Sequence, residues 1–157
     1  MRIGIGYDAH RFQIGRELLL GGIVIPYKYG LSGHSDADVL IHSIIDALLG
    51  ASNLGDIGKW FPDTDHQFKN ANSINLLKVT HQMITESGYQ VINTDSVIVA
   101  EEPKLKDYIP LMCEKLSLIL NIQKDSISVK ATTTEGMGFT GKKEGIAAQT
   151  VCLLEQR

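Results

Sequence analysis

The sequence is poor in the residues that mark several common protein classes. Its 157 residues include only two cysteines, Cys113 and Cys152, which lie far apart inside apolar runs. We therefore expect both thiols to be small buried groups in a reducing compartment, and their number excludes a zinc site built on thiolates. No segment approaches the ~20 consecutive apolar residues of a membrane-spanning helix. Residues Met1–Gly6 carry neither a signal-peptide run nor a transit segment, so we expect a cytoplasmic protein with no membrane partner.

An excess of positive charge is also missing. The chain has 15 Lys and Arg against 18 Asp and Glu, a formal net charge of -3. This balance argues against nucleic acid as a partner, because a broad nucleic-acid surface needs clustered basic residues. The content of 43% apolar and 21% charged residues is typical of a soluble globular protein. The length fits a single domain over residues 1–157.

Hydrophobic periodicity and capping residues predict a mixture of strands and helices. We expect strands at 2–7, 18–20, 23–25, 90–100 and 127–131, and helices at 39–51, 72–87 and 107–120. Ser35 or Asp36 is the expected N-cap of the first helix and Asn72 that of the second. Residues 52–69 read as a long loop, and 145–155 fit a helix as well as a buried strand. The fold class is α/β or α+β, with helices packed on one sheet.

Two glycine-rich segments resemble nucleotide-binding motifs. Residues 4–9 match the dinucleotide pattern G-x-G-x-x-A, but no helical pattern follows that could hold a pyrophosphate at its N-terminus. Residues 136–143 approach a phosphate loop, yet Lys143 stands where a Ser or Thr would bind magnesium. The interpretation of residues 4–9 as a dinucleotide-binding motif is therefore rejected. The second segment remains open between a phosphate-binding turn and a solvated loop.

A metal site is the strongest functional hypothesis that the residues themselves offer. Asp8 and His10 are two apart on the first strand, so their side chains project from the same face. Both are common zinc ligands, although such a pair alone is more often structural. His42 follows on the first helix and supplies a third candidate ligand. Two ligands from a strand and one from a helix leave a fourth position open, which is the pattern of catalytic zinc.

The first helix also carries a polar stripe of Asp38, His42 and Asp46 at intervals of four residues. A solvated face would explain such a stripe, but no Lys, Arg or Glu occurs between Gly33 and Gly50. Acids and histidines without basic partners suggest a site that takes its cations from outside. We expect Asp38 or Asp46 to accept the second ring N–H of His42 behind the metal.

Taken together, these segments resemble the family of 2-C-methyl-D-erythritol 2,4-cyclodiphosphate synthases. The resemblance covers essentially the whole chain in short motifs that occur in the family's order. The motifs are Gly6–His10, His34–Asp38 with His42, Ala47–Ala51, Leu54–Gly58, Phe61–Asp65, Pro103–Leu105, Val129–Glu135, Gly138–Gly141 and Glu144–Ala147.

The resemblance implies a mixed sheet with helices on one face, with residues 145–155 as a strand. It implies a homotrimer with a central assembly of sheets and active sites between neighbouring subunits. One Zn²⁺ per subunit would be held by Asp8, His10 and His42, and a second ion, Mg²⁺ or Mn²⁺, would bridge the diphosphate and Glu135. His34, Thr133 and Glu135 would be the catalytic residues.

The implied reaction converts 4-diphosphocytidyl-2-C-methyl-D-erythritol 2-phosphate to the 2,4-cyclodiphosphate and CMP. The attacking phosphate is already anionic, which agrees with the lack of a Ser-His-Asp or Cys-His arrangement, and residues 52–69 would act as a lid. The implied contacts of the methylerythritol part are Asp56, Ile57, Gly58 and the loop 61–65 with Phe61, Asp63 and Asp65. Asp8, His10, His34 and Ser35 are further implied substrate contacts. Those of the cytidine diphosphate part are Ala100, Pro103, Lys104, Leu105, Lys106, Thr132, Thr133, Thr134, Glu135, Phe139 and Lys142.

Two positions depart from some family members. Lys142 stands where some carry Arg, which keeps the charge but loses the bidentate fork, and Glu101 stands where some carry Gln. Two other functions stay as alternatives. One is a zinc-dependent phosphohydrolase that activates water at the same site, and the other is a non-catalytic, metal-stabilised trimer that binds nucleotides.

Overall fold

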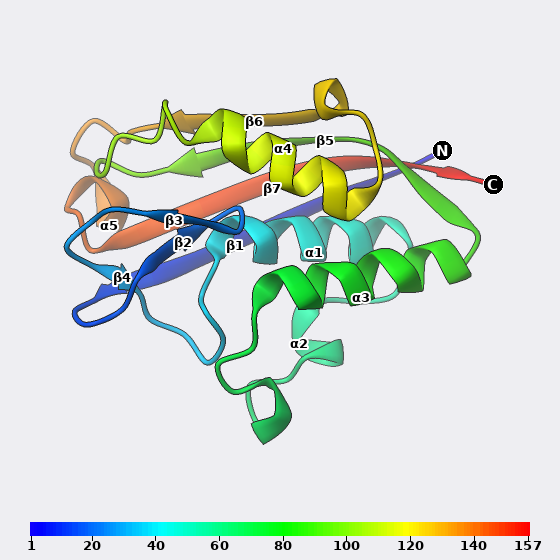
Figure 1. Cartoon of the computed structure of the whole chain (residues 1–157), viewed down its shortest axis with the longest axis horizontal. Helices are drawn as coiled ribbons and strands as arrows, with labels where there is room; N and C mark the ends of the chain where they lie inside the picture. The colour runs from blue at the N-terminus through cyan, green and yellow to red at the C-terminus, as the bar shows by residue number, and fades with distance from the viewer.

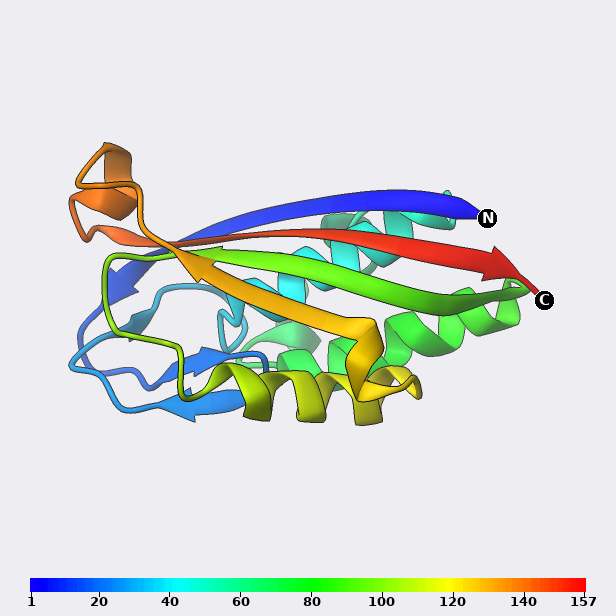
Figure 2. The same cartoon turned by 90° about the horizontal axis from the view of Figure 1, so that it is seen from above.

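The chain folds into a five-stranded sheet that carries its three long helices on one face (Figures 1 and 2). The computed structural model describes residues 1–157. The sheet has the order β4-β1-β7-β5-β6, and only the β5–β6 pair is parallel. Its strands are β1 Arg2–Gln13, β4 Gly30–Leu31, β5 Tyr89–Val99, β6 Ile127–Thr132 and β7 Gly145–Gln156. The hairpin beside it is made by β2 Leu18–Leu20 and β3 Ile23–Ile25.

The long helices are α1 Val39–Ala51, α3 Ser73–Glu86 and α4 Ile109–Leu120. Short helical turns are α2 Ile57–Trp60, η1 His66–Phe68, η2 Lys124–Ser126 and α5 Gly138–Gly141. The predicted α+β class with helices on one face is therefore confirmed, and residues 52–69 are less irregular than expected because they contain α2 and η1. None of these helices combines the length and the hydrophobicity that a membrane-spanning segment requires.

Residues 145–155, for which periodicity allowed either a helix or a strand, lie in strand β7. It is paired along its length with β1 on one side and β5 on the other, so it is a central strand. Its first four residues are all buried and the burial then alternates, so the apolar positions do not show a clean two-residue period and also fit a helix. The strand implied by the family resemblance is confirmed.

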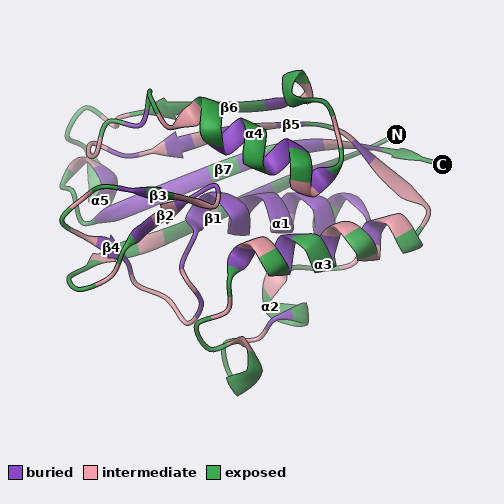
Figure 3. Ribbon diagram, viewed as in Figure 1, coloured by how far each residue is buried: buried purple, intermediate pink, exposed green.

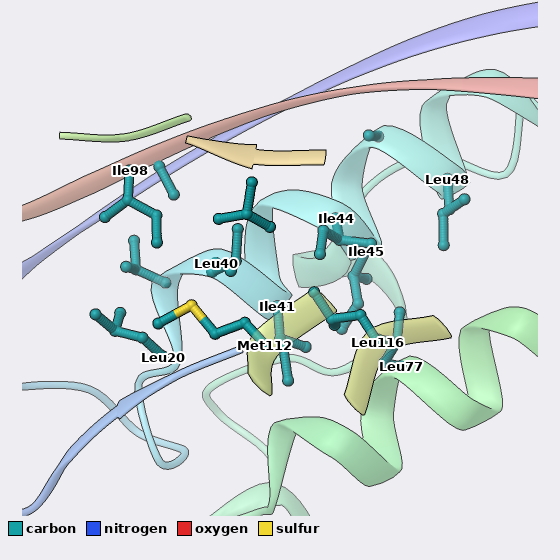
Figure 4. Close-up of a cluster of buried hydrophobic side chains, with 14 of the residues drawn as sticks. Leu20, Leu40, Ile41, Ile44, Ile45, Leu48, Leu77, Ile98, Met112 and Leu116 are labelled. Atoms are coloured by element: carbon teal, nitrogen blue, oxygen red, sulfur yellow. The ribbon is translucent and has the colours of Figure 1, made fainter. Parts of the chain in front are cut away.

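Helix α1 lies in the middle of the core and is buried almost all round (Figure 3). Its apolar side chains lie in one cluster with those of α3, α4 and β5. Figure 4 shows this cluster, with Leu77 from α3, Met112 and Leu116 from α4, and Ile98 from β5. Burial of this cluster of 32 residues provides the main driving force for the fold. Cys113 and Cys152 are both buried and unpaired, as predicted.

Two glycines bring α1 unusually close to β1. A Cβ at Gly4 would lie 1.9 Å from the carbonyl oxygen of Ala47, and a Cβ at Gly6 would lie 1.9 Å from that of Ser43. Only glycine allows this approach of helix and strand. The next residues on the same face of β1 are Asp8 and His10, so the close packing sets α1 directly against them.

The start of α1 differs from the prediction. Asp38 is the N-cap, and its carboxylate accepts the N–H of Ile41. Neither Ser35 nor Asp36 caps the helix, because the chain turns through a positive φ of 57° at Ala37 before the helix begins. Asn72 caps α3 as expected.

Candidate metal centre and active site

Three side chains that are distant in the sequence meet where α1 crosses β1. The ligand atoms of Asp8, His10 and His42 all lie within 4.8 Å of one another. One carboxylate oxygen of Asp8, Oδ2, is 2.8 Å from His10 Nε2 and 3.0 Å from His42 Nδ1. The two ring nitrogens are 3.3 Å apart. The three predicted zinc ligands therefore form one cluster.

The orientation of the histidine rings favours the binding of a cation by the cluster. His10 Nδ1 lies 2.7 Å from the carbonyl oxygen of Ser32, which can only accept, so Nδ1 carries the proton and Nε2 faces the cluster. A second ring nitrogen and a carboxylate converge on the same point. Such a set of oxygen and imidazole donors fits a divalent ion such as zinc, with room for a further ligand.

The electrostatics of the cluster agree with a cation-binding site. Burial favours a neutral Asp8, yet hydrogen bonds and Coulomb attraction from His10 and His42 outweigh it and hold the pKa of Asp8 well below its usual range. Burial likewise favours a neutral His10, but the hydrogen bond and charge of Asp8 outweigh it and raise the pKa of His10. The cluster stabilises positive charge, whether a proton or a metal ion supplies it.

A cavity of about 290 Å³ opens beside the cluster. Its walls come from β1, from the segment before α1 and from the loop around α2. Eight of the residues implied as substrate contacts line it. These are Asp8, His10, His34, Ser35, Ile57, Gly58, Phe61 and Asp63.

Two implied methylerythritol contacts, Asp56 and Asp65, do not line this cavity. Asp56 caps α2 by accepting the N–H of Lys59 at 2.9 Å. Asp65 caps η1, and its carbonyl oxygen lies 3.3 Å from the ring of His34. Both carboxylates therefore shape the loop on which other contacts lie.

A second cavity, of about 340 Å³, lies at the end of β5 and β6, away from the metal cluster. It gathers most of the implied cytidine diphosphate contacts. These are Ala100, Pro103, Lys104, Leu105, Lys106, Thr132 and Thr133. Within one chain the two halves of the implied substrate site thus line separate cavities. Phe139 lines a third cavity, together with His10.

The turn after β6 carries Thr134 and Glu135, which line none of these cavities. Glu135 has a positive φ of 53°, an unusual conformation for a residue with a side chain. The carboxylate of Glu101 holds this turn by accepting the backbone N–H groups of Thr134 at 3.0 Å and Gly136 at 3.2 Å. Lys142 follows α5 and is exposed. The difference at position 101, where some family members carry Gln and this chain has Glu101, therefore affects the residue that holds the turn with Glu135.

Asp38 and Asp46 do not accept a hydrogen from His42, contrary to our expectation. Asp38 is buried and accepts the backbone N–H groups of Gly21, Gly22 and Ile41. Asp46 accepts the N–H of Ile57 at 2.7 Å and so fixes the start of α2. Both carboxylates hold backbone rather than the imidazole.

His42 Nε2 instead faces two hydroxyl groups, Ser73 Oγ at 2.9 Å and Ser35 Oγ at 3.2 Å. The sequence pattern missed Ser73 because it belongs to α3, 31 residues away. It also missed Arg16, whose guanidinium donates to the carbonyl oxygens of Gly33 at 2.8 Å and Ser35 at 2.5 Å. Arg16 thereby holds the segment that carries His34.

Comparison with known proteins agrees with the motifs. A family model described as the YgbB family matches residues 1–155. The chain is 57% identical to the 2-C-methyl-D-erythritol 2,4-cyclodiphosphate synthase of Clostridium kluyveri, over 98% of this chain and 94% of that protein. It is 54% identical to the enzyme of the same name from Clostridium perfringens, over 98% and 99%. The chain belongs to the 2-C-methyl-D-erythritol 2,4-cyclodiphosphate synthase family.

Solved structures show that this synthase fold extends over the whole chain. The bifunctional IspDF protein of Campylobacter jejuni superposes with a TM-score of 0.96 at 47% identity. The match covers 99% of this chain but 42% of that protein, so this chain corresponds to less than half of it. A Plasmodium falciparum structure described as an IspF complex with CDP gives a TM-score of 0.88 at 34% identity, over 99% and 96% of the two chains. The family resemblance inferred from the motifs is confirmed.

Proposed function

We propose that this chain converts 4-diphosphocytidyl-2-C-methyl-D-erythritol 2-phosphate to 2-C-methyl-D-erythritol 2,4-cyclodiphosphate and CMP in isoprenoid biosynthesis. The reaction is an intramolecular phosphoryl transfer, and the enzyme a phosphorus–oxygen lyase. The observation that carries the proposal is the Asp8–His10–His42 cluster in the wall of the 290 Å³ cavity, in a chain 54–57% identical to synthases of that name.

We assign a zinc ion to Asp8, His10 and His42, and a second ion, magnesium or manganese, to Glu135. When bound, these ions supply Lewis-acid stabilisation of charge on phosphoryl oxygens. The donor set supports the assignment, because imidazole and carboxylate ligands suit zinc and a lone carboxylate beside a diphosphate suits magnesium.

The chain's own residues hold and orient the substrate. His34 and Ser35 lie on the wall of the metal-side cavity, where they can donate hydrogen bonds to phosphoryl oxygens. Thr133 lines the second cavity, and its hydroxyl lies 3.4 Å from the carboxylate of Glu135. No general base is needed, since the attacking phosphate is anionic. Holding the reacting groups in line contributes about 7–11 kcal/mol in well-oriented intramolecular reactions.

We propose that the protein acts in the cytoplasm as a homotrimer whose active sites lie between subunits. One support is the separation of the two cavities within one chain. The other is the sheet face opposite the helices, where Ile3, Ile5 and Tyr7 are 75%, 63% and 57% exposed. A large exposed apolar patch marks an interaction surface. Packing such faces around an axis would cover it and bring a second cavity to each metal site.

The test is phosphorus NMR of the purified protein with substrate, magnesium and trace zinc, before and after chelation. We expect cyclodiphosphate and CMP only when metal is present. Formation of CDP or inorganic phosphate would instead support a phosphohydrolase at the same site. A folded, zinc-loaded trimer that gives no product would point to a nucleotide-binding role.

A further inference from the structure

We infer that Ser73 and Asp36 are positioning residues that fix the tautomer and orientation of His42. They hold the ring with Nε2 protonated and with the lone pair of Nδ1 directed at the metal position. The inference rests on the metal site of the proposed function. It concerns a residue of α3 and a residue of the segment before α1, neither of which lies in the cluster itself.

The contacts form a short relay behind His42. The ring Nε2 lies 2.9 Å from Ser73 Oγ, and the Ser73 hydroxyl in turn contacts Asp36 Oδ1. The backbone N–H of Ser73 donates to the other carboxylate oxygen, Asp36 Oδ2, at 2.9 Å. Ser73 is fully buried and His42 is 8% exposed, so bulk water does not compete for these groups.

The direction of the hydrogen bonds follows from the chemistry of the groups. Both oxygens of Asp36 accept backbone N–H groups, from Asp38 at 3.2 Å and from Ser73 at 2.9 Å, so the carboxylate acts as an acceptor on both sides. A serine hydroxyl has one proton, which it donates to Asp36. The Ser73 oxygen then offers only lone pairs to His42, and the imidazole must donate from Nε2. Its other nitrogen, Nδ1, faces the Asp8 carboxylate, 3.0 Å from Oδ2, and is the nitrogen left to bind a metal ion.

Ser35 does not determine the tautomer in the same way. Its oxygen is 3.2 Å from His42 Nε2 and accepts the N–H of Ala37, but no other acceptor takes its own proton. The Ser35 hydroxyl is thus free to donate or accept. Ser73 is constrained, because it is the first residue of α3 and its hydroxyl and its N–H both bond the same carboxylate.

A competing explanation is that Ser73 and Asp36 only fasten α3 to the segment before α1. The two explanations differ in what a variant changes. A residue with a purely structural role affects the stability of the protein alone. A positioning residue also sets the tautomer of His42 and the affinity for metal. Partners behind a metal-bound histidine typically affect metal affinity by about 10–100-fold.

The experiment has two readouts in the full chain. The first is the ¹⁵N chemical shifts of the His42 ring in metal-free protein, which report which nitrogen is protonated. The second is the zinc dissociation constant, from competition with a chelating dye. In the wild type we expect Nε2 protonated, and in Ser73→Ala a mixture of tautomers with zinc binding about 10–100-fold weaker.

The matched control is Ser52→Ala. Ser52 is also a buried helix-end serine, and its hydroxyl donates to the carbonyl oxygens of Leu48 and Leu49, away from the metal cluster. It should lose stability without a change in zinc affinity. Ser73→Thr keeps the hydroxyl and should restore zinc binding. Asp36→Asn replaces one of the two acceptor oxygens by an NH2 donor and removes the charge without emptying volume, so it serves if Ser73→Ala does not fold.

The outcomes separate this inference from the proposed function. Equal zinc affinity and an unchanged His42 tautomer in Ser73→Ala and Asp36→Asn would overturn the inference and leave the metal site standing. A wild type that binds no zinc would overturn the metal site, and the tautomer measurement in metal-free protein would still decide whether the relay fixes the ring.

Discussion

The approach of α1 to β1 at Gly6 offers a sharp test of how the fold builds the site. A Cβ at this position would lie 1.9 Å from the carbonyl oxygen of Ser43, whereas real Cβ atoms essentially never come closer than 3.0 Å. The difference, 3.0 minus 1.9, means that Gly6→Ala must separate strand and helix by about 1.1 Å at this point. The obstructing atom belongs to the backbone, so no side-chain rotation relieves the clash.

Two consequences follow from this shift. Overpacking of this kind costs about 1–3 kcal/mol, so the free energy of unfolding should fall by at least that amount. His42 is the neighbour of Ser43 and its partner Asp8 is two residues from Gly6, so the shift also separates the candidate metal ligands. A displacement of ~1 Å in an active site can lower activity about 100-fold.

Gly50→Ala provides a control for which we expect a change in stability of the opposite sign. Gly50 is an exposed residue of the same helix, and the nearest atom to a Cβ there is 3.9 Å away. Alanine should therefore stabilise the protein by about 0.5–1 kcal/mol, because it lowers the entropy of the unfolded chain without strain. Urea denaturation and zinc titration of both variants provide the measurement. If Gly6→Ala is as stable as the wild type and binds zinc equally well, then the contact between α1 and β1 does not set the site.

Three further predictions concern the site itself. His42→Ala removes one of the three proposed metal ligands and should abolish turnover, measured by phosphorus NMR, while circular dichroism still shows a folded protein. Glu101→Ala frees the turn that carries Glu135 and should lower turnover without changing zinc affinity at the Asp8 cluster, whereas Glu101→Gln, which keeps an acceptor, should lose less. The pKa of His10 is raised by Asp8, so its contribution to the stability of the metal-free protein is fully present below the ordinary value of 6.5 and is lost as pH rises through the raised pKa. Urea midpoints should therefore fall from pH 6 to pH 8.5, and His10→Asn should remove this dependence.

Each of these predictions has a clear opposite result. A fully active His42→Ala would remove the metal cluster from the mechanism. A Glu101→Ala variant with wild-type turnover would show that the turn holds its shape without the two hydrogen bonds. A urea midpoint that rises with pH over this range would mean that the Asp8 carboxylate does not raise the pKa of His10.

The sequence was most informative where a pattern is local. Periodicity and capping residues predicted α1, α3 and α4, and the alternation of β1 placed Asp8 and His10 on one face. The N-cap of α1 was wrong because its real cap, Asp38, is selected by the hairpin glycines whose N–H groups it accepts. The contact between Asp38 and these glycines joins residues distant in the sequence, so no local sequence pattern indicates it.

The surroundings of His42 show the same limit. The polar stripe on α1 made a carboxylate one turn away the natural partner, since residues four apart are neighbours on a helix. In the structure Asp46 faces α2, and the hydroxyl of Ser73 arrives from α3. The choice depends on how α3 packs against α1, which periodicity within either helix cannot specify.

Metal removal tests whether an ion bound by Asp8, His10 and His42 is required for the chain to fold. The ligands are held from both sides by contacts that contain no metal, namely the packing of α1 on Gly4 and Gly6 and the buried cluster of 32 residues around α1. We therefore expect the chelated protein to stay folded, with its unfolding free energy reduced only by the linkage term. That term is about 4 kcal/mol at a zinc concentration 1,000 times the dissociation constant. Calorimetry of the chelated protein and of protein with graded zinc measures it. A chelated chain that loses its cooperative transition would show that the ion is structural, and the non-catalytic, metal-stabilised trimer would then be the better account.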